Sequence, residues 1–213
     1  MTVKRTPRLG VGRACAAHCH RGAAEQSAHL DAPERDEWQR PELVVAAAGL
    51  TLGQVVADVG AGTGYFEVHL SQAVGASGKV LALDVNRSLV EHMRRRFHDA
   101  GLNNVEARVL RHDDPGLEPG SVDRVLIVDL WHHLHDRVAY GRKLRTALRP
   151  EGRLLVIDRG TGSSHAPPVG MRISVETVIG ELDAAGFRTR LLPQALPRQF
   201  MVEGAVRSAT LPA

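Results

Sequence analysis

The chain has 213 residues, 43% of them hydrophobic, which is enough for one domain with a sizeable core. No apolar run is long enough to cross a membrane, and the basic N-terminal segment lacks the apolar stretch of a secretory signal. The net charge of +3 comes from residues 1–30, because the remainder carries 22 basic and 23 acidic residues. We therefore expect a cytoplasmic protein whose body binds neither nucleic acid nor a membrane.

Residues 1–30 are expected to form a flexible basic extension, and residues 31–213 the folded domain. The only cysteines, Cys15 and Cys19, lie in that extension, so no disulfide framework holds the fold and a reducing compartment is indicated. The segment CAAHCH places two histidines beside them, and such ligands could bind zinc or copper. The alternative interpretation is a solvated tail, because no second group of ligands lies nearby.

Strand and helix patterns alternate from residue 41 onward. Pro41 in a first turn and Gly49 as a stop signal predict a short helix. Apolar runs predict strands at 54–59, 79–85, 105–110, 123–130 and 152–158. Helical spacing predicts helices at 65–74, 88–100, 138–149 and 175–185, the last with Ser174 as its N-cap. Strands at 187–193 and 198–207 follow without a helix between them, so one should be antiparallel in a mainly parallel sheet.

A glycine-rich turn follows the first expected strand in the segment DVGAGTG, which contains Gly60, Gly62 and Gly64. Parallel sheets bind ligands at the carboxyl ends of their strands. The dinucleotide fingerprint fails, because Tyr65 stands where it needs a third glycine. Asp84 ends the next strand, where an acid accepts hydrogen bonds from ribose hydroxyls, and Asp58 would repel a phosphate but suit an ammonium group. A ribose joined to an amino-acid ammonium describes S-adenosylmethionine.

Four segments, VVADVGAGTGYF, VLALDV, PGSVDRVLIVDLWHHL and LRPEGRLLVID, resemble in order and spacing the motifs of class I S-adenosylmethionine-dependent methyltransferases. The resemblance covers roughly residues 33–206 and is to small bacterial methyltransferase-domain proteins, distantly similar to quinone C-methyltransferases. It implies an α/β fold with a Rossmann-like, mostly parallel seven-stranded sheet of order 3-2-1-4-5-7-6, strand 7 antiparallel, and helices on both faces. It also implies S-adenosyl-L-methionine as cofactor but says little about the substrate. Because we find no separate target-recognition domain in the sequence, we expect a small molecule as methyl acceptor.

The same resemblance assigns cofactor-binding residues. The three glycines match the cofactor loop, Asp58 the acid before it, and Asp84 the ribose-binding acid. Many relatives carry Gly-Asp-Ala after strand three, where this chain has Leu-Arg-His at 110–112. Asp113 or Asp114 is expected to reach the adenine instead. The altered stretch keeps a second interpretation open, a regulatory protein that binds the cofactor without turnover.

Candidate chemistry follows the fourth strand, where Asp129 is expected to border both the cofactor's methyl group and the substrate. The cofactor brings its own leaving group, so a base is needed only if the acceptor must lose a proton. His132 or His133 is the candidate base, with Asp129 as a further catalytic candidate; the histidines could instead cover the adenine, cap the next helix or join Asp129 in a metal site. Asp129 and Asp158 resemble the acids of Mg²⁺-dependent O-methyltransferases, but Arg159 replaces the usual amide, so no metal is expected.

Two further features limit the acceptor. The stretch Asp129-Leu130-Trp131-His132 lacks the Pro-Pro-aromatic sequence typical of enzymes that methylate nucleobase amines, and the body lacks the cysteines that arsenite methylation needs. The Gly- and Pro-containing loop 160–170 could close over a small acceptor or be a simple connector.

Overall fold

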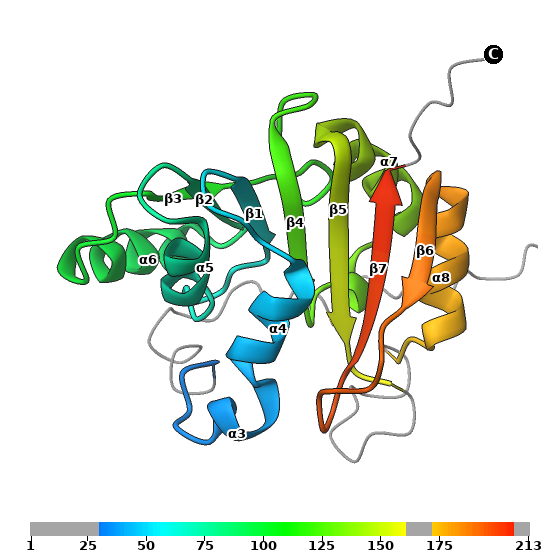
Figure 1. Cartoon of the computed structure of the whole chain (residues 1–213), viewed down its shortest axis with the longest axis horizontal. Helices are drawn as coiled ribbons and strands as arrows, with labels where there is room; N and C mark the ends of the chain where they lie inside the picture. Colours follow the sequence, from blue (N-terminus) through cyan, green and yellow to red (C-terminus); the bar gives the residue numbers. More distant parts are fainter. Residues whose placement is uncertain (1–29, 161–171, 207–213) are drawn as a thin grey trace, which may run out of the picture.

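The structure is a computed structural model that describes residues 30–160 and 172–206. The cysteine-containing segment and the expected loop from residue 161 onward lie outside these ranges. Within them a seven-stranded sheet forms the centre of the molecule (Figure 1). Its strands are β1 Val55–Val59, β2 Lys79–Asp84, β3 Val105–Val109, β4 Val122–Val128, β5 Leu148–Asp158, β6 Phe187–Leu191 and β7 Phe200–Val206.

The strand order is β3-β2-β1-β4-β5-β7-β6, as predicted. All pairs from β3 to β5 are parallel, and β7 runs antiparallel to both β5 and β6. The predicted fold class is therefore confirmed. In this topology the carboxyl ends of β1, β2, β4 and β5 meet at one edge of the sheet, which is where ligands bind in open α/β sheets.

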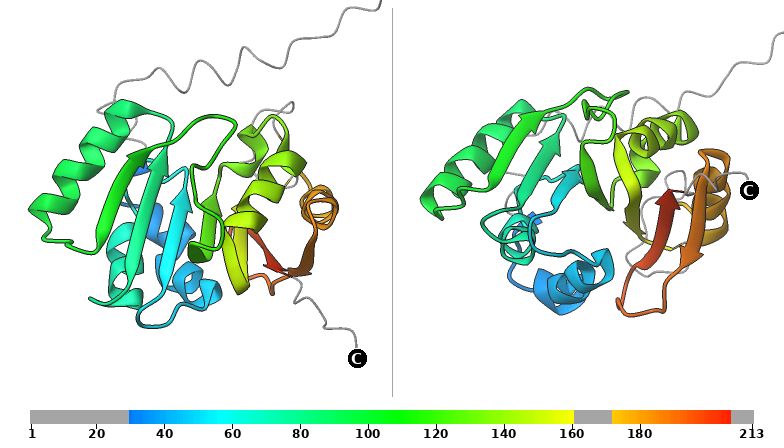
Figure 2. Two further views of the ribbon diagram at one scale, coloured as in Figure 1. Left: turned by 90° about the horizontal axis from the view of Figure 1, so that it is seen from above. Right: turned by 45° about the horizontal axis from the view of Figure 1, so that its top comes forward.

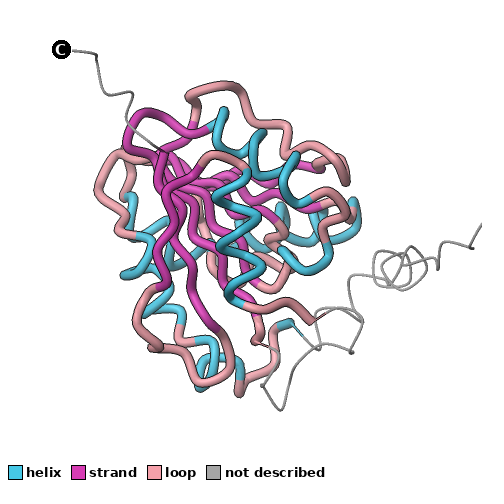
Figure 3. The backbone as a smooth tube through the Cα atoms, turned by 90° about the vertical axis from the view of Figure 1, so that its right-hand side faces the viewer, coloured by secondary structure: helices cyan, strands magenta, loops and turns pink. Residues whose placement is uncertain are grey.

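Helices cover both faces of the sheet (Figures 2 and 3). Their bounds are α3 Arg35–Gln39, α4 Pro41–Ala48, α5 Glu67–Val74, α6 Arg87–Asp99, α7 Arg137–Ala147 and α8 Val175–Ala184, with a 3-10 turn η1 at Trp131–His133. Residues of α4 and α5 share a buried cluster on one face, and residues of α7 and α8 share one on the other. Figure 2 shows α4 and α7 on opposite sides of the sheet.

Local signals set several helix ends. Gly49 follows α4 with φ 58°, a left-handed conformation that glycine adopts at little cost. The Asn86 side chain accepts from the Ser88 N–H at 2.9 Å and caps α6. Ser174 accepts from the Thr177 N–H at 3.2 Å and caps α8, as predicted.

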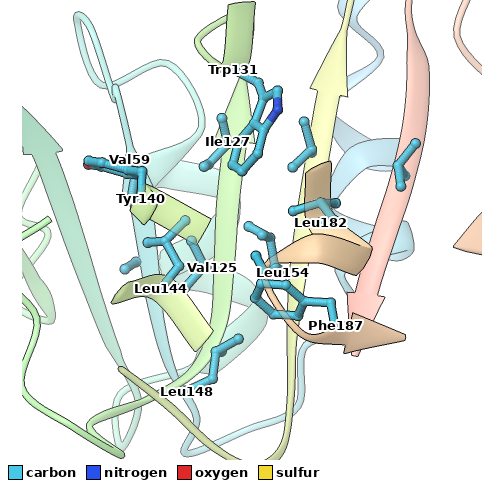
Figure 4. Close-up of a cluster of buried hydrophobic side chains, with 14 of the residues drawn as sticks. Val59, Val125, Ile127, Trp131, Tyr140, Leu144, Leu148, Leu154, Leu182 and Phe187 are labelled. Carbon is cyan, nitrogen blue, oxygen red and sulfur yellow. The ribbon is translucent and has the colours of Figure 1, made fainter. Parts of the chain in front are cut away.

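The largest buried cluster lies between the sheet and helices α7 and α8 (Figure 4). Trp131 and Phe187 are completely buried in it. The Trp131 indole Nε1 donates to Glu181 Oε2 on α8 at 2.9 Å, which satisfies its polar atom inside the core. This anchor fixes η1, and with it the histidines that follow Trp131.

Two local expectations differ from the structure. Helix α3 was not predicted, because five residues are too few to show a periodicity. The helix expected at 138–149 ends earlier, at Ala147, and β5 begins at Leu148. The pairing of β5 with β4 shifts register between Val122 and Arg124 of β4. Glu151 of β5 has φ 65°, so β5 accommodates Pro150 through a local irregularity. Among the described residues, no helix is long and apolar enough to cross a membrane.

Candidate functional site

The loop after β1 bends across the end of β2. The N–H groups of Gly60 and Ala61 both donate to the Leu83 carbonyl, at 2.7 and 3.0 Å. The three glycines have positive φ values of 84°, 63° and 84°. At Gly60 an added Cβ would lie 2.8 Å from Leu130 Cδ2, so the segment that follows β4 presses directly on this loop.

A substitution at Gly64 tests how tightly the loop after β1 is packed against α6. An alanine there would place Cβ 2.6 Å from Phe97 Cε1 of α6, at a φ of 84° that side chains rarely adopt. We expect Gly64→Ala to lower the free energy of unfolding by about 2 kcal/mol through strain and displaced packing. Urea unfolding would measure it. Gly116→Ala is the matched control, because Gly116 also has a positive φ of 60° but no atom within 4 Å of its added Cβ; an equal loss in both variants would show that packing contributes nothing.

Asp84 ends β2 beside this loop and is 8% exposed. Its Oδ2 accepts from the Gly62 N–H at 3.0 Å and its Oδ1 from the Asn86 N–H at 2.8 Å. Burial raises the pKa of Asp84, while these backbone donors and the nearby His112 oppose the rise. The two oxygens of Asp84 have four lone pairs, and the backbone N–H groups of Gly62, Asn86 and Val85 take up to three of them, so a position remains to accept a hydroxyl. The geometry fits a hydroxyl-bearing ligand such as a ribose.

Asp58 and Glu67 form a buried carboxyl pair beneath the loop. Asp58 is the fourth residue of β1 and is 2% exposed, and Glu67 begins α5 at 0%. No donor among the described residues reaches either oxygen of Glu67. The two carboxyls therefore form a coupled pair that favours keeping a proton. Burial raises the pKa of Asp58 to about 7, and burial together with Asp58 raises the pKa of Glu67 well above its usual range.

Arg35 of α3 lies above the same loop, a position that the sequence did not reveal. Its guanidinium carbon stands 3.9 Å from the centre of the Tyr65 ring, and Nη1 donates to the Leu30 carbonyl at 2.5 Å. Its Nε is buried and has no hydrogen-bond partner among the described residues. Burial lowers the pKa of Arg35, while Asp129 and Asp58 are close enough to oppose this. An orphaned cationic donor of this kind fits an anionic group such as a carboxylate.

Asp129 stands directly after β4 with φ 51°. Arg159 Nη2 donates to its Oδ2 at 3.0 Å, and Gln199 Nε2 donates to its Oδ1 at 2.8 Å. Gln199 also accepts from Gln39 Nε2 of α3 at 2.7 Å, so a buried polar chain joins α3 to the sheet. Burial raises the pKa of Asp129, and Arg159 opposes the rise. Both carboxylate oxygens are thus already bonded within the protein.

His132 and His133 lie side by side on η1, with ring centres 4.1 Å apart. His132 Nδ1 is 2.8 Å from Asp158 Oδ1 at the end of β5. Asp158 is completely buried, and the His132 side chain is 6% exposed. The structure therefore brings His132 and Asp158 together, although the sequence analysis associated Asp158 only with a metal.

Asp113 is placed apart from the other predicted residues. Its side chain is 70% exposed and accepts from Arg111 Nε at 3.2 Å. The neighbouring His112, not Asp113, is close enough to influence Asp84 electrostatically. A contact between Asp113 or Asp114 and adenine stays a prediction. Among residues 30–160 and 172–206, no group of three or more histidine, cysteine or acidic residues is placed to hold a metal ion.

Comparisons with known proteins agree with this geometry. Residues 56–152 match a family model described as a methyltransferase domain. The solved structure of a SAM-dependent methyltransferase from Aquifex aeolicus is 28% identical, with a TM-score of 0.81 over 88% of this chain and 100% of that one. The chain is therefore similar, in sequence and in fold, to class I S-adenosylmethionine-dependent methyltransferases. The buried Arg35 Nε, which has no hydrogen-bond partner among the described residues, and the remaining acceptor position of Asp84 fit S-adenosylmethionine.

Other similar proteins differ in the reaction that they catalyse. The ubiquinone/menaquinone biosynthesis C-methyltransferase UbiE of Pseudoalteromonas translucida is 30% identical over 122 residues, 57% of this chain and 48% of that protein. The chain therefore spans about half the length of the curated relatives it matches. The [4+2]-cyclase SpnF has the same fold, at 21% identity and a TM-score of 0.62 over 73% of this chain and 57% of that one. Fold alone thus does not determine the reaction.

Proposed function

We propose that this protein transfers the methyl group of S-adenosylmethionine to a small-molecule acceptor. The observation that carries the proposal is the contact of Asp84 with the glycine loop. It places a carboxylate with an acceptor position left for a hydroxyl beside a glycine-rich backbone turn, at the joint edge of β1 and β2. A nucleoside fits both features, because the acid can bind the ribose and the glycine-rich turn permits close approach of the backbone.

Each part of the cofactor has a candidate partner in the chain. Asp84 would accept from the ribose hydroxyls, and Arg35 would bind the carboxylate of the methionine part. Asp58 would attract the ammonium group of the same methionine part. When bound, S-adenosylmethionine supplies a methyl group on a positively charged sulfur that is also the leaving group. The protein's own contribution is to hold the reactants in line and exclude water.

A small-molecule acceptor is supported by the similarity to UbiE, a C-methyltransferase of ubiquinone and menaquinone biosynthesis. The nearly neutral body gives no electrostatic footprint for a polyanion. A cytoplasmic location stays a prediction from the sequence.

Isothermal titration calorimetry with S-adenosylmethionine and its demethylated product tests cofactor binding, with NADH as the comparison ligand. We expect both adenosyl compounds to bind and NADH not to bind. Transfer of a tritiated methyl group to a panel of small molecules tests turnover. Absence of binding at millimolar cofactor would contradict the proposal, and binding without transfer to any acceptor would favour a regulatory protein.

The assignment of Arg35 predicts a selective loss of affinity. Glutamine at this position keeps a donor but removes the charge, so Arg35→Gln should weaken S-adenosylmethionine binding about 10-fold, since a charge-assisted hydrogen bond contributes about 1.5–3 kcal/mol. Methylthioadenosine has no amino-acid carboxylate, and its calorimetric affinity should stay within about twofold. An equal loss for both ligands would show that Arg35 supports the loop and does not bind the carboxylate.

A further inference from the structure

We infer, building on the proposed function, that His132 is a general base that removes a proton from the methyl acceptor, and that Asp158 is the residue that positions it. The acceptor is accordingly a molecule with an acidic hydroxyl group. Of the two adjacent histidines, the structure singles out His132.

Asp158 fixes one side of the His132 imidazole. Its Oδ1 and Oδ2 lie 2.8 and 3.0 Å from Nδ1. The same carboxylate accepts the backbone N–H groups of His132 and Arg159, at 3.1 and 2.7 Å. A carboxylate held by backbone donors can only accept from the ring, so Nδ1 carries the hydrogen and the lone pair of the neutral imidazole lies on Nε2.

Nε2 is left available by the residues that the structure describes. The His132 side chain contacts Asp158 through Nδ1, and its ring lies against the His133 ring, tilted by 38°. His132 follows closely on Leu130, whose side chain packs against Gly60 of the glycine-rich loop. The dyad therefore stands at the carboxyl edges of β4 and β5, next to the proposed cofactor site.

The other charged groups around His132 are already engaged. Asp129 at the end of β4 is bonded by Arg159 and Gln199, so it is a poor competitor as base. Arg159, after β5, places its charge on Asp129 and its backbone N–H on Asp158. The ring of His133 lies against that of His132, tilted by 38°. At this edge, Nδ1 of His132 is held by a carboxylate, while its Nε2 stays available among the described residues.

The proton balance requires a protic acceptor. Nε2 takes the proton of the acceptor hydroxyl, and the electron pair left on the acceptor forms the bond to the methyl carbon, either from oxygen or from a conjugated ring carbon. The electron pair of the broken carbon–sulfur bond stays on sulfur, and His132 then releases its proton to water. Because histidine titrates near neutral pH, it suits phenols and enols better than alkyl alcohols, whose protons are far less acidic.

Nuclear magnetic resonance of the ¹⁵N-histidine-labelled full chain at pH 8 tests the tautomer without any acceptor. Long-range ¹H–¹⁵N correlations, assigned with His132→Gln, should show the hydrogen of His132 on Nδ1. Asp158→Asn places an amide donor beside the ring, and the hydrogen should then move to Nε2. Detection of the hydrogen on Nε2 in the unmodified protein, or an unchanged spectrum in Asp158→Asn, would overturn the inference.

Turnover tests the proton transfer itself. With a series of substituted phenols of decreasing pKa, His132→Gln should lower kcat about 100- to 10,000-fold for weakly acidic phenols and progressively less for phenols already ionised at the assay pH. Asp158→Asn should show the same trend with a shifted pH profile. His98→Gln is the matched control, because His98 makes an exposed contact with Asp99 at 3.2 Å on α6, far from this edge in sequence.

Calorimetry separates this inference from the proposed function. Cofactor affinity should stay within about twofold in His132→Gln. A loss of rate that is equal for every phenol, or methylation of thioethers and tertiary amines but of no phenol, would overturn the role of His132 while leaving methyl transfer intact. A protein that fails to bind S-adenosylmethionine at all would contradict the proposed function instead.

Discussion

Replacing Asp84 with alanine is expected to weaken S-adenosylmethionine binding by about 3 kcal/mol, or more than 100-fold. Two losses contribute. The ribose hydroxyls lose a charged acceptor, and the Gly62 N–H loses the partner that holds the loop at 3.0 Å. Hydrogen bonds to charged groups contribute about 1.5–3 kcal/mol each, so the combined effect exceeds that of a single contact.

Calorimetry of the full chain would measure this loss, and circular dichroism would confirm that the variant is folded. A 2′-deoxyadenosyl analogue should lose less affinity in Asp84→Ala than the ribosyl compound does, because one of the two hydroxyls is already missing. Asp99→Ala is the control, since Asp99 is 79% exposed on α6. Unchanged cofactor affinity in folded Asp84→Ala would contradict the ribose assignment and with it the proposed orientation of the cofactor.

The Asp58–Glu67 pair is expected to make the protein less stable as pH rises. The pKa of Asp58 in the folded chain is about 7 against an ordinary value of 3.8, so between these values the folded state binds more protons than the unfolded state. The stabilising contribution is therefore complete below about pH 4 and is lost as pH rises through about 7. One pKa unit corresponds to about 1.4 kcal/mol, so the raised pKa of this coupled pair makes its ionisation a cost to the folded state at neutral and higher pH.

Glu67→Gln isolates this effect. The glutamine amide can donate permanently to Asp58, so Asp58 can ionise without a competing carboxyl. We expect the variant to match the unmodified protein near pH 5 and to exceed its free energy of unfolding at pH 8, measured by urea unfolding. Glu91→Gln, an exposed position on α6, should show no such divergence. Parallel pH profiles for Glu67→Gln and the unmodified chain would show that the pair does not share a proton.

The sequence predicted the parts of this molecule that depend on local pattern. Apolar runs located all seven strands, and alternate glycines together with Asp84 located the loop. These signals are local because a buried strand must be apolar and a tight turn needs positive φ. The residues that sequence reasoning missed depend on tertiary contacts. Arg35 reaches the loop from an unpredicted helix, and its position before β1 carries no motif.

The His132–Asp158 dyad depends partly on local pattern and partly on tertiary contacts. The two residues are 26 positions apart, and only the pairing of β4 with β5 brings them together. A predicted register would have revealed it, because pairing Val128 with Ile157 sets Asp158 at the level of the residue that follows β4. The shifted pairing near Val122 shows why register could not be read from strand lengths alone.

The buried chain from Gln39 through Gln199 to Asp129 has a consequence for biosynthesis. Its first member lies near the start of the described chain and its middle member just before the last strand, with 160 positions between them. On the ribosome, the hydrogen bond that links this buried chain to Asp129 cannot form until nearly the whole polypeptide has emerged, because Gln199 supplies it. A C-terminally shortened polypeptide that ended before Gln199 would leave that oxygen of Asp129 without this donor.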